Sequence, residues 1–250
     1  IKENSKAVLY VDSLMAVNCS EVTVDDMVVV LGEKVDFSSI AAFAEATELS
    51  VQIDGEVQQG TSFTPTAAGK YTVVITGETS TQYIRAEFIV RAAEEGTVLD
   101  FSSAGDAPTS GDVNKASWLA SYEGAEGVLK MDVGSWEWLG YMNTDAWRPY
   151  FGKDTYEKYE YLAFRVRLEG LNAGETLNAY FKVEGTAVED NAQYGLRFTA
   201  NTDGWTTVLM PIDILVNNLD GFAQKTQWTF SGIKENSKAV LYVDSLMAVN

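Results

Sequence analysis

The chain has 250 residues, of which 46% are hydrophobic and 12% aromatic, and its formal charge is −18 at pH 7 with a pI of about 4.3. Such an acidic surface repels nucleic acid and anionic lipid, and no apolar run is long enough for membrane insertion. Histidine is absent, which excludes a Ser-His-Asp triad, and the single cysteine, Cys19, excludes an internal disulfide and a thiolate zinc site.

The first 18 residues, IKENSKAVLYVDSLMAVN, recur letter for letter as residues 233–250. Identity over such a stretch indicates a tandem array with a period of 232 residues, long enough for two ordinary domains. Arrays of whole domains are more often stalks, fibres or multivalent binders than enzymes. We therefore expect residues 1–18 to be the closing strand of the preceding repeat. Left unpaired, this apolar strand would dock by strand addition onto a neighbouring molecule or onto another domain's edge.

Residues 19–95 predict a small β-sandwich, because short strands with period-2 alternation are separated by turn residues. Only 38–49 has helical character. The segment FTPTAAGKYTVVI (63–75) resembles the Ig-like modules of bacterial surface proteins, in which a tyrosine forms a corner at the sandwich edge. The resemblance implies an Ig-like domain, with the Tyr71 hydroxyl bonded to a backbone group.

A charged hinge at 91–97 leads to a second predicted unit over 97–250. Its strands include a "D-F" start at VLDF (98–101), a central YEYLAFRV (159–166), a GWTTVLMP segment (204–211) and a closing LYVDSL (241–246). In this order they resemble the galactose-binding-like jelly rolls that serve as carbohydrate-binding modules. The resemblance implies a jelly-roll β-sandwich. The fold class expected for the chain is thus all-β, an Ig-like sandwich followed by a jelly roll.

Aromatic residues are densest over 135–161, and sugar rings stack on such side chains while their hydroxyls need planar polar partners. Alternation over 128–133, 161–169, 177–183 and 193–199 predicts which side chains face inward and which outward. The predicted inward residues are Leu129, Met131, Val133, Leu162, Phe164, Val166, Leu168, Leu177, Ala179, Phe181, Val183, Tyr194, Leu196 and Phe198. If alternation continues through Gly134, Trp136 and Trp138 face outward. The predicted carbohydrate-binding set, taken as one face, is Trp136, Trp138, Tyr180, Arg165, Arg167, Arg197 and Asp132.

An alternative is open for the tryptophans. A bulge at Gly134 would turn Trp136 and Trp138 into the core, where most tryptophans of β-sandwiches lie. Trp205 and Trp228 occupy positions that look structural in the resembled family, and we assign them to packing. Trp118 is undecided.

Related jelly rolls often hold a structural calcium between their first and last strands. The resemblance implies Asp100 and Asp244 as its ligands, with Asp106 weaker and Asp12 equivalent to Asp244 in the N-terminal copy. The alternative is that these aspartates cap turns.

The sequence therefore predicts a non-catalytic repeat unit of a secreted or surface-attached bacterial protein. Its jelly roll binds a glycan or polysaccharide, its Ig-like domain is a spacer, and repetition multiplies weak sites into avidity. The alternative function is a purely structural stalk or filament whose copies assemble through residues 1–18. Neither nucleic acid nor a membrane is an expected partner.

Overall fold

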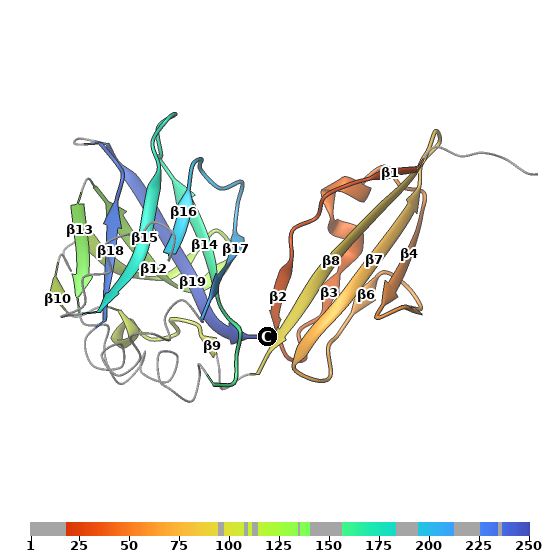
Figure 1. Ribbon diagram of the computed structural model, residues 1–250, viewed down its shortest axis with the longest axis horizontal. Coiled ribbons are helices and arrows are strands. Elements are labelled where there is room, and N and C mark those ends of the chain that lie inside the picture. The colour runs from red at the N-terminus through yellow and green to blue at the C-terminus, as the bar shows by residue number, and fades with distance from the viewer. Residues whose placement is uncertain are drawn as a thin grey trace, which may run out of the picture. The chain divides into compact units, whose positions relative to one another are not determined.

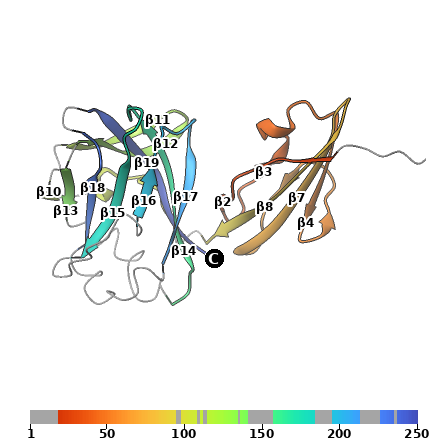
Figure 2. The same cartoon turned by 45° about the horizontal axis from the view of Figure 1, so that its top comes forward.

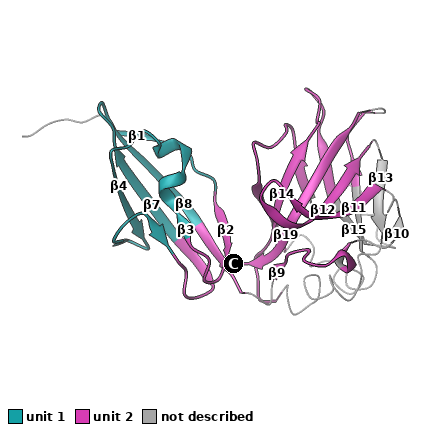
Figure 3. Ribbon diagram, turned by 180° about the vertical axis from the view of Figure 1, so that it is seen from behind, with its two compact units in different colours: residues 1–25, 35–63, 72–89 teal, residues 26–34, 64–71, 90–250 magenta. Residues whose placement is uncertain are grey.

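The computed structural model describes the chain in segments, namely 19–94, 98–107, 110–111, 115–134, 136–140, 157–183, 195–212, 226–234 and 237–250. The chain divides into two compact units, coloured separately in Figure 3. Unit 1 holds the described residues up to Asp25 together with Val35–Phe63 and Thr72–Ile89, and unit 2 holds 26–34, 64–71 and everything from Val90 onward. The described residues are all-β, with only short 3-10 turns between strands, and none of their helices is long and apolar enough to cross a membrane.

The N-terminal part of the chain forms a six-stranded sheet and a two-stranded sheet (Figure 1). The larger sheet has the order β1-β8-β7-β4-β5, and β2 also pairs with β8; the smaller sheet pairs β3 with β6. Both β1 and β2 run parallel to β8, whereas β4 pairs antiparallel with β5 and β7. The strands are β1 Cys19–Glu21, β2 Met27–Val30, β3 Val35–Asp36, β4 Glu48–Ile53, β5 Glu56–Val57, β6 Ser62–Phe63, β7 Gly69–Glu78 and β8 Tyr83–Ala93.

The structure differs from the expected helical character of residues 38–49 and agrees with the expected tyrosine corner at Tyr71. The helical segment over 38–49 is two 3-10 turns instead, η1 (Phe37–Ser39) and η2 (Ala41–Phe43), and β4 begins at Glu48. Burial of Phe37 and Phe43 in the core fixes the two turns and leaves no length for an α-helix. The tyrosine corner is confirmed, because the Tyr71 hydroxyl donates a hydrogen bond to the carbonyl of Ala67 at 2.6 Å.

The C-terminal part is a sandwich of two sheets, seen as two layers in Figure 2. One, here called the β19 sheet, has the order β11-β12-β19-β14-β17 with β9 also on β19, and the other, the β15 sheet, has the order β10-β13-β18-β15-β16. The strands are β9 Val98–Leu99, β10 Ser110–Gly111, β11 Ala116–Tyr122, β12 Ala125–Val133, β13 Trp136–Gly140, β14 Tyr161–Glu169, β15 Leu177–Val183, β16 Gly195–Phe198, β17 Thr206–Pro211, β18 Thr226–Ser231 and β19 Ala239–Val249.

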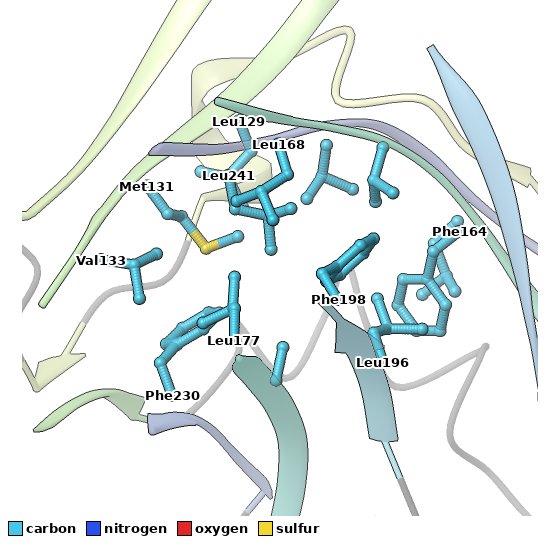
Figure 4. Packing of buried hydrophobic residues seen from close by; sticks show 14 of the residues in the cluster. Leu129, Met131, Val133, Phe164, Leu168, Leu177, Leu196, Phe198, Phe230 and Leu241 are labelled. Carbon is cyan, nitrogen blue, oxygen red and sulfur yellow. The ribbon is translucent and has the colours of Figure 1, made fainter. Parts of the chain in front are cut away.

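The core of the sandwich lies between these two sheets, and alternation predicts which side chains fill it. In Figure 4, Leu129, Met131 and Val133 of β12 point toward Leu177 and Phe230 of the β15 sheet. Each of these side chains is buried, so the predicted inward sets of the strands are confirmed wherever the side chains are described. The core also takes the other predicted inward residues, Leu162, Phe164, Val166, Leu168, Ala179, Leu196 and Phe198.

The last strand of the sandwich, β19, is also its most enclosed. It pairs antiparallel with β12 on one side and with β14 on the other, and its C-terminal end pairs with β9. A register shift between Arg165 and Val166 of β14 leaves Asp244 as the extra residue of a bulge. The bulge lets Val243 and Leu246, three positions apart, both face the core.

The segment before β19 is held by a buried carboxylate. Glu175, in the loop between β14 and β15, accepts hydrogen bonds from the Ser237 hydroxyl at 2.5 Å and from the backbone N–H groups of Lys234 and Asn172, both at 3.2 Å. The hydrogen bond from Ser237 is the main reason why the pKa of Glu175 lies below its usual value; burial acts in the opposite direction. The charged form of Glu175 is therefore part of the folded structure.

In the turn after β14, the backbone of Gly170 lies close to the backbone of Lys238. Gly170 has a φ of 76°, and a Cβ placed there would lie 2.2 Å from the carbonyl oxygen of Lys238, whereas Gly174 has a φ of 79° with open space around it. We expect Gly170→Ala to lower the free energy of unfolding by roughly 2–4 kcal/mol and Gly174→Ala by about 1 kcal/mol, measured by urea denaturation. Equal losses would mean that the close approach to Lys238 has no energetic consequence.

The stabilising charge of Glu175 predicts that the stability of the fold depends on pH. Because the pKa of Glu175 is lower in the folded state than the ordinary 4.5, its charge stabilises the fold fully above pH 4.5, and this stabilisation is lost as the pH falls through the folded-state pKa. We expect Glu175→Gln to destabilise the protein at neutral pH and to converge with the unmodified protein in acid. Urea denaturation from about pH 7 to about pH 3 measures this. Glu126→Gln, at an exposed position of β12, is the matched control, and a pH-independent loss at Glu175 would contradict the assignment.

Candidate functional site

The predicted binding residues do not form one face. The chain leaves the β19 sheet at Val133, passes Gly134, and enters the β15 sheet as β13, so alternation does not carry through this point within a single sheet. Three of the predicted residues belong to strands of the β19 sheet and four to strands of the β15 sheet. The predicted set is therefore divided between the two sheets. The first set is Asp132, Arg165 and Arg167; the second is Trp136, Trp138, Tyr180 and Arg197.

The outer face of the β19 sheet, here called the arginine face, is set by the register of three strands. Lys130 of β12 pairs with Tyr242 of β19, which pairs in turn with Arg167 of β14. In the next row, Asp132 pairs with Val240, which pairs with Glu169. Because directly opposed residues of neighbouring strands point to the same side, each row brings charged groups together on this face.

An aromatic pair lies under Arg167. The rings of Tyr122 and Tyr242 are stacked with centroids 4.0 Å apart, and the guanidinium of Arg167 lies 5.9 Å from the Tyr122 centroid. Arg167 Nε donates to Glu169 at 2.6 Å, and the Tyr122 hydroxyl donates to the same carboxylate at 3.1 Å. A hydrogen bond with Tyr242, then burial and a hydrogen bond with Glu169, raise the pKa of Tyr122. The phenol therefore stays a neutral donor at physiological pH.

A second arginine lies over a second aromatic ring. Arg165 donates to Asp244 at 2.6 Å, and its guanidinium lies 5.4 Å from the Trp205 ring centroid. Trp205 Nε1 donates to the backbone carbonyl of Glu123 at 3.1 Å, so the indole is fixed at the edge of this face. From the sequence, Trp205 is expected to serve packing alone. Trp205 packs against the cluster that contains Tyr242, and its ring also lies beneath Arg165. The sequence does not reveal this contact with Arg165, because it depends on the pairing of β14 with β17.

The three cations of the arginine face form ion pairs with carboxylates of the same face. Arg165 pairs with Asp244, Arg167 with Glu169 and, at 3.7 Å, with Glu123, and Lys130 with Asp132 at 3.1 Å. The guanidinium groups also lie on the aromatic rings, which are thereby less open to a ligand. Chemically the face offers paired planar donors and acceptors. Such pairs suit vicinal hydroxyls but present no bare ring for stacking.

The outer face of the β15 sheet, here called the tryptophan face, is set by the register of four strands. One row runs from Trp138 through Thr229 to Tyr180, and the next from Trp136 through Ser231 and Asn178 to Arg197. The intervening row contains the buried Phe230, Ala179 and Leu196. The backbone positions of Trp136 and Trp138 thus belong to rows that alternate with the core row.

Two described residues add polar character to the tryptophan face. Arg197 is exposed. The side-chain oxygen of Asn178, between Ser231 and Arg197 in its row, is buried without a hydrogen-bond partner. An acceptor in that state is costly unless something satisfies it. The side chains of Trp136, Trp138 and Tyr180 lie outside the described residues, so their part in binding stays a prediction.

Both predicted calcium ligands, Asp100 and Asp244, have hydrogen-bond partners within the protein. Asp100 Oδ1 accepts from the backbone N–H of Ser102 at 3.0 Å, the geometry of a turn cap, and Asp244 is bonded to Arg165. Asp100, Asp244 and Arg165 line the same pocket, so a cation there would meet a fixed guanidinium. Within the described ranges, no three acidic, histidine or cysteine side chains converge as metal ligands. Calcium needs six to eight oxygens. Asp12 and the side chain of Asp106 lie outside the described residues.

Trp118, undecided from the sequence, donates through Nε1 to the carbonyl of Phe101 at 2.7 Å and pairs with Leu129, which faces the core. It is therefore a structural residue of the β19 sheet. The side chain of Trp228 lies outside the described residues.

Comparison with known proteins gives likeness of structure only. No family model matches the chain, and no curated protein matches its sequence. Among solved structures, the chain is similar to the CBM51-2 and INT domains of Clostridium perfringens ZmpB, at 13% identity over 90% of this chain and 47% of that chain, with a TM-score of 0.39. It thus spans about half the length of that structure.

Two further solved structures are similar to the chain. A structure of carbohydrate-binding modules from the β-sandwich superfamily is 13% identical over 81% of this chain and 85% of its own, with a TM-score of 0.35. A CBM4 structure is 10% identical over 61% of this chain and 85% of its own, with a TM-score of 0.28. Likeness at these scores does not assign a function to the chain.

The ion pair at Asp244 predicts how the protein responds to calcium. We expect Asp244→Asn to lower the free energy of unfolding by about 1 kcal/mol, with or without a chelator, because Arg165 loses its partner. Asp132→Asn, at an exposed pair with Lys130, is the control with a smaller effect. Thermal denaturation in EDTA and in calcium chloride measures both. A rise of Tm in calcium that Asp100→Asn or Asp244→Asn abolishes would restore the calcium site.

Proposed function

We propose that the jelly roll is a non-catalytic carbohydrate-binding module that holds a glycan on its tryptophan face. The observation that supports this proposal is the strand register, in which positions 136, 138, 180 and 197 belong to three strands of one sheet and to the two rows on either side of the buried Phe230 row. Two indoles, a phenol and a guanidinium on a flat surface are the groups that a sugar needs, since its CH faces stack on rings and its hydroxyls bond to planar polar groups.

The spacing of these positions favours a chain of sugars over a single one. Alternate residues of one strand, such as Trp136 and Trp138, are separated by about 7 Å, and Tyr180 lies two strands away, about 10 Å from Trp138. A surface of this extent reaches past one sugar ring. An oligosaccharide or polysaccharide that runs across the strands is therefore the expected ligand.

The arginine face is the less favourable site for the same ligand. Its three cations are each bonded to carboxylates, and its rings are covered by guanidinium groups or by each other. A ligand there would have to replace interactions that the protein already makes.

The rest of the proposal concerns the protein that carries the module. The repeat of residues 1–18 at 233–250 supports an array in which the Ig-like domain spaces successive jelly rolls. Repetition turns weak sites into avidity, which suits a secreted or surface-attached bacterial protein that holds a polysaccharide. The absence of histidine and of any catalytic motif in the sequence supports a role without catalysis.

A glycan array probed with the whole chain tests the proposal, followed by calorimetry on any glycan that binds. We expect Trp136→Ala/Trp138→Ala to weaken binding at least tenfold, a loss of about 1.4 kcal/mol or more. The matched variant Arg165→Ala/Trp205→Ala removes one cation and one indole from the arginine face and should change affinity by less than about threefold.

Three results would count against the proposal. Loss of binding in the arginine-face variant alone would move the site to that face. Unchanged binding in both variants would remove both faces from consideration. No binding by a protein with a cooperative unfolding transition would reject glycan binding and leave the structural alternative.

A further inference from the structure

A row of polar side chains crosses the outer face of the β15 sheet. Ser231 of β18 pairs with Asn178 of β15, which pairs in turn with Arg197 of β16. In each of these strands the chain neighbours within the strand are buried in the core, so the three side chains lie on the outer side of the sheet. Because neighbouring strands are about 4.8 Å apart, this polar row extends over about 10 Å.

Arg197 differs from the other described arginines in its charge environment. Those arginines each bond to an aspartate or glutamate, and they are Arg85, Arg91, Arg165 and Arg167. Arg197 is exposed, and it forms an ion pair with no carboxylate in the described part of the chain. Its neighbours in the polar row are neutral. In a chain with 36 acidic and 18 basic residues, Arg197 therefore offers a positive charge that a ligand can meet.

The other outer rows of the β15 sheet have the same sign of charge. In the described register these rows contain, by backbone position, two cations and no aspartate or glutamate. The rows are Trp136, Ser231, Asn178 and Arg197, then Trp138, Thr229, Tyr180 and Gly195, then Lys182 and Gln227. The cations of the arginine face, by contrast, are paired with carboxylates. The outer rows of the β15 sheet are thus opposite in charge to the chain as a whole.

We propose that the glycan held on the tryptophan face is an acidic polysaccharide and that Arg197 binds its sugar carboxylates. This inference rests on the proposed function and specifies the class of its ligand. A guanidinium presents parallel N–H groups that match the two oxygens of a carboxylate. A neutral sugar meets the same guanidinium through single hydroxyls and gains less from its charge.

A polymer can use Arg197 and the tryptophan positions together. Trp136 and Arg197 stand at opposite ends of one row, three strands or about 14 Å apart by backbone position. A ligand that reaches both therefore places a stacked ring and a carboxylate on different sugars of one chain.

The net charge of −18 does not prevent this binding. At physiological ionic strength the Debye length is about 8 Å, so an acidic ligand responds mainly to the charges nearest to it. The nearest described charge on the polar row is that of Arg197. A local cation therefore decides the preference between an acidic and a neutral glycan.

Esterification of the ligand and substitution of Arg197, both measured on the whole chain by calorimetry, test the inference together. Polygalacturonate and polysialic acid are the probes, each beside its methyl ester, and they distinguish a uronate from a sialic acid as the carboxylated sugar. We expect at least one acid form to bind roughly three- to tenfold more tightly than its ester. Arg197→Gln should weaken the acid form by about the same factor and the ester by less than about twofold.

Two variants serve as controls. Arg85→Gln removes the same charge from an arginine that is paired with Glu87 in the N-terminal sheet, and it should change either affinity by less than about twofold. Arg197→Lys keeps the charge without the parallel donors, so its affinity for the acid form should lie between those of Arg197→Gln and the unmodified protein. Because Arg197 is exposed, urea denaturation should show unchanged stability in both of its variants.

Three results would overturn the inference and leave the proposed function intact. One is binding confined to neutral glycans of the array. Another is equal binding of acid and ester that Trp136→Ala/Trp138→Ala still abolishes. The third is an equal loss in Arg85→Gln and Arg197→Gln, since net charge would then govern binding. A folded protein that binds no glycan at all would reject the proposed function and this inference with it.

Discussion

The pairing of β19 between β12 and β14 is the interaction on which the jelly roll depends. These two ladders hold the centre of one sheet, and the side chains of β19 supply part of the core that the other sheet covers. The strand β19 is the last described strand in chain order, and it is the strand that joins β12 to β14 in the sheet. The Glu175 carboxylate reinforces this closure, because it binds the segment that leads into the strand.

The bulge at Asp244 of β19 places a carboxylate beside Arg165 on the outer surface of the sheet. The extra residue keeps Leu246 in the core after Val243 and presents the Asp244 carboxylate to Arg165. The pair Arg165–Asp244, the pair Arg167–Glu169 and the aromatic rings beneath them form a network in which each charge has a partner. Half-exposed ion pairs contribute little stability individually, so the network orients side chains more than it holds the fold together.

The crossing of the chain at Gly134 decides which surface could bind a ligand. A sandwich has two outer faces, and the residues on either side of this glycine belong to different sheets. Trp136 and Trp138 of β13 thus belong to a different sheet from Arg165 and Arg167, and β13 shares its sheet with β15 and β16. The two faces also differ in character, since one is saturated with ion pairs and the other combines aromatic positions with an unpaired amide oxygen.

The sequence by itself determined the all-β class, the strands, the inward-facing side chains of β12, β14, β15 and β16 where these are described, and the Tyr71 corner. These features depend on alternation and turn chemistry, which are local. Only the tertiary structure decided which strands are neighbours. It therefore decided the separation of the predicted site residues onto two faces, the support of Arg165 by Trp205, and the use of Asp244 as an ion-pair partner. The physical reason is that alternation gives the side of a strand to which a residue points but not the sheet in which that strand pairs.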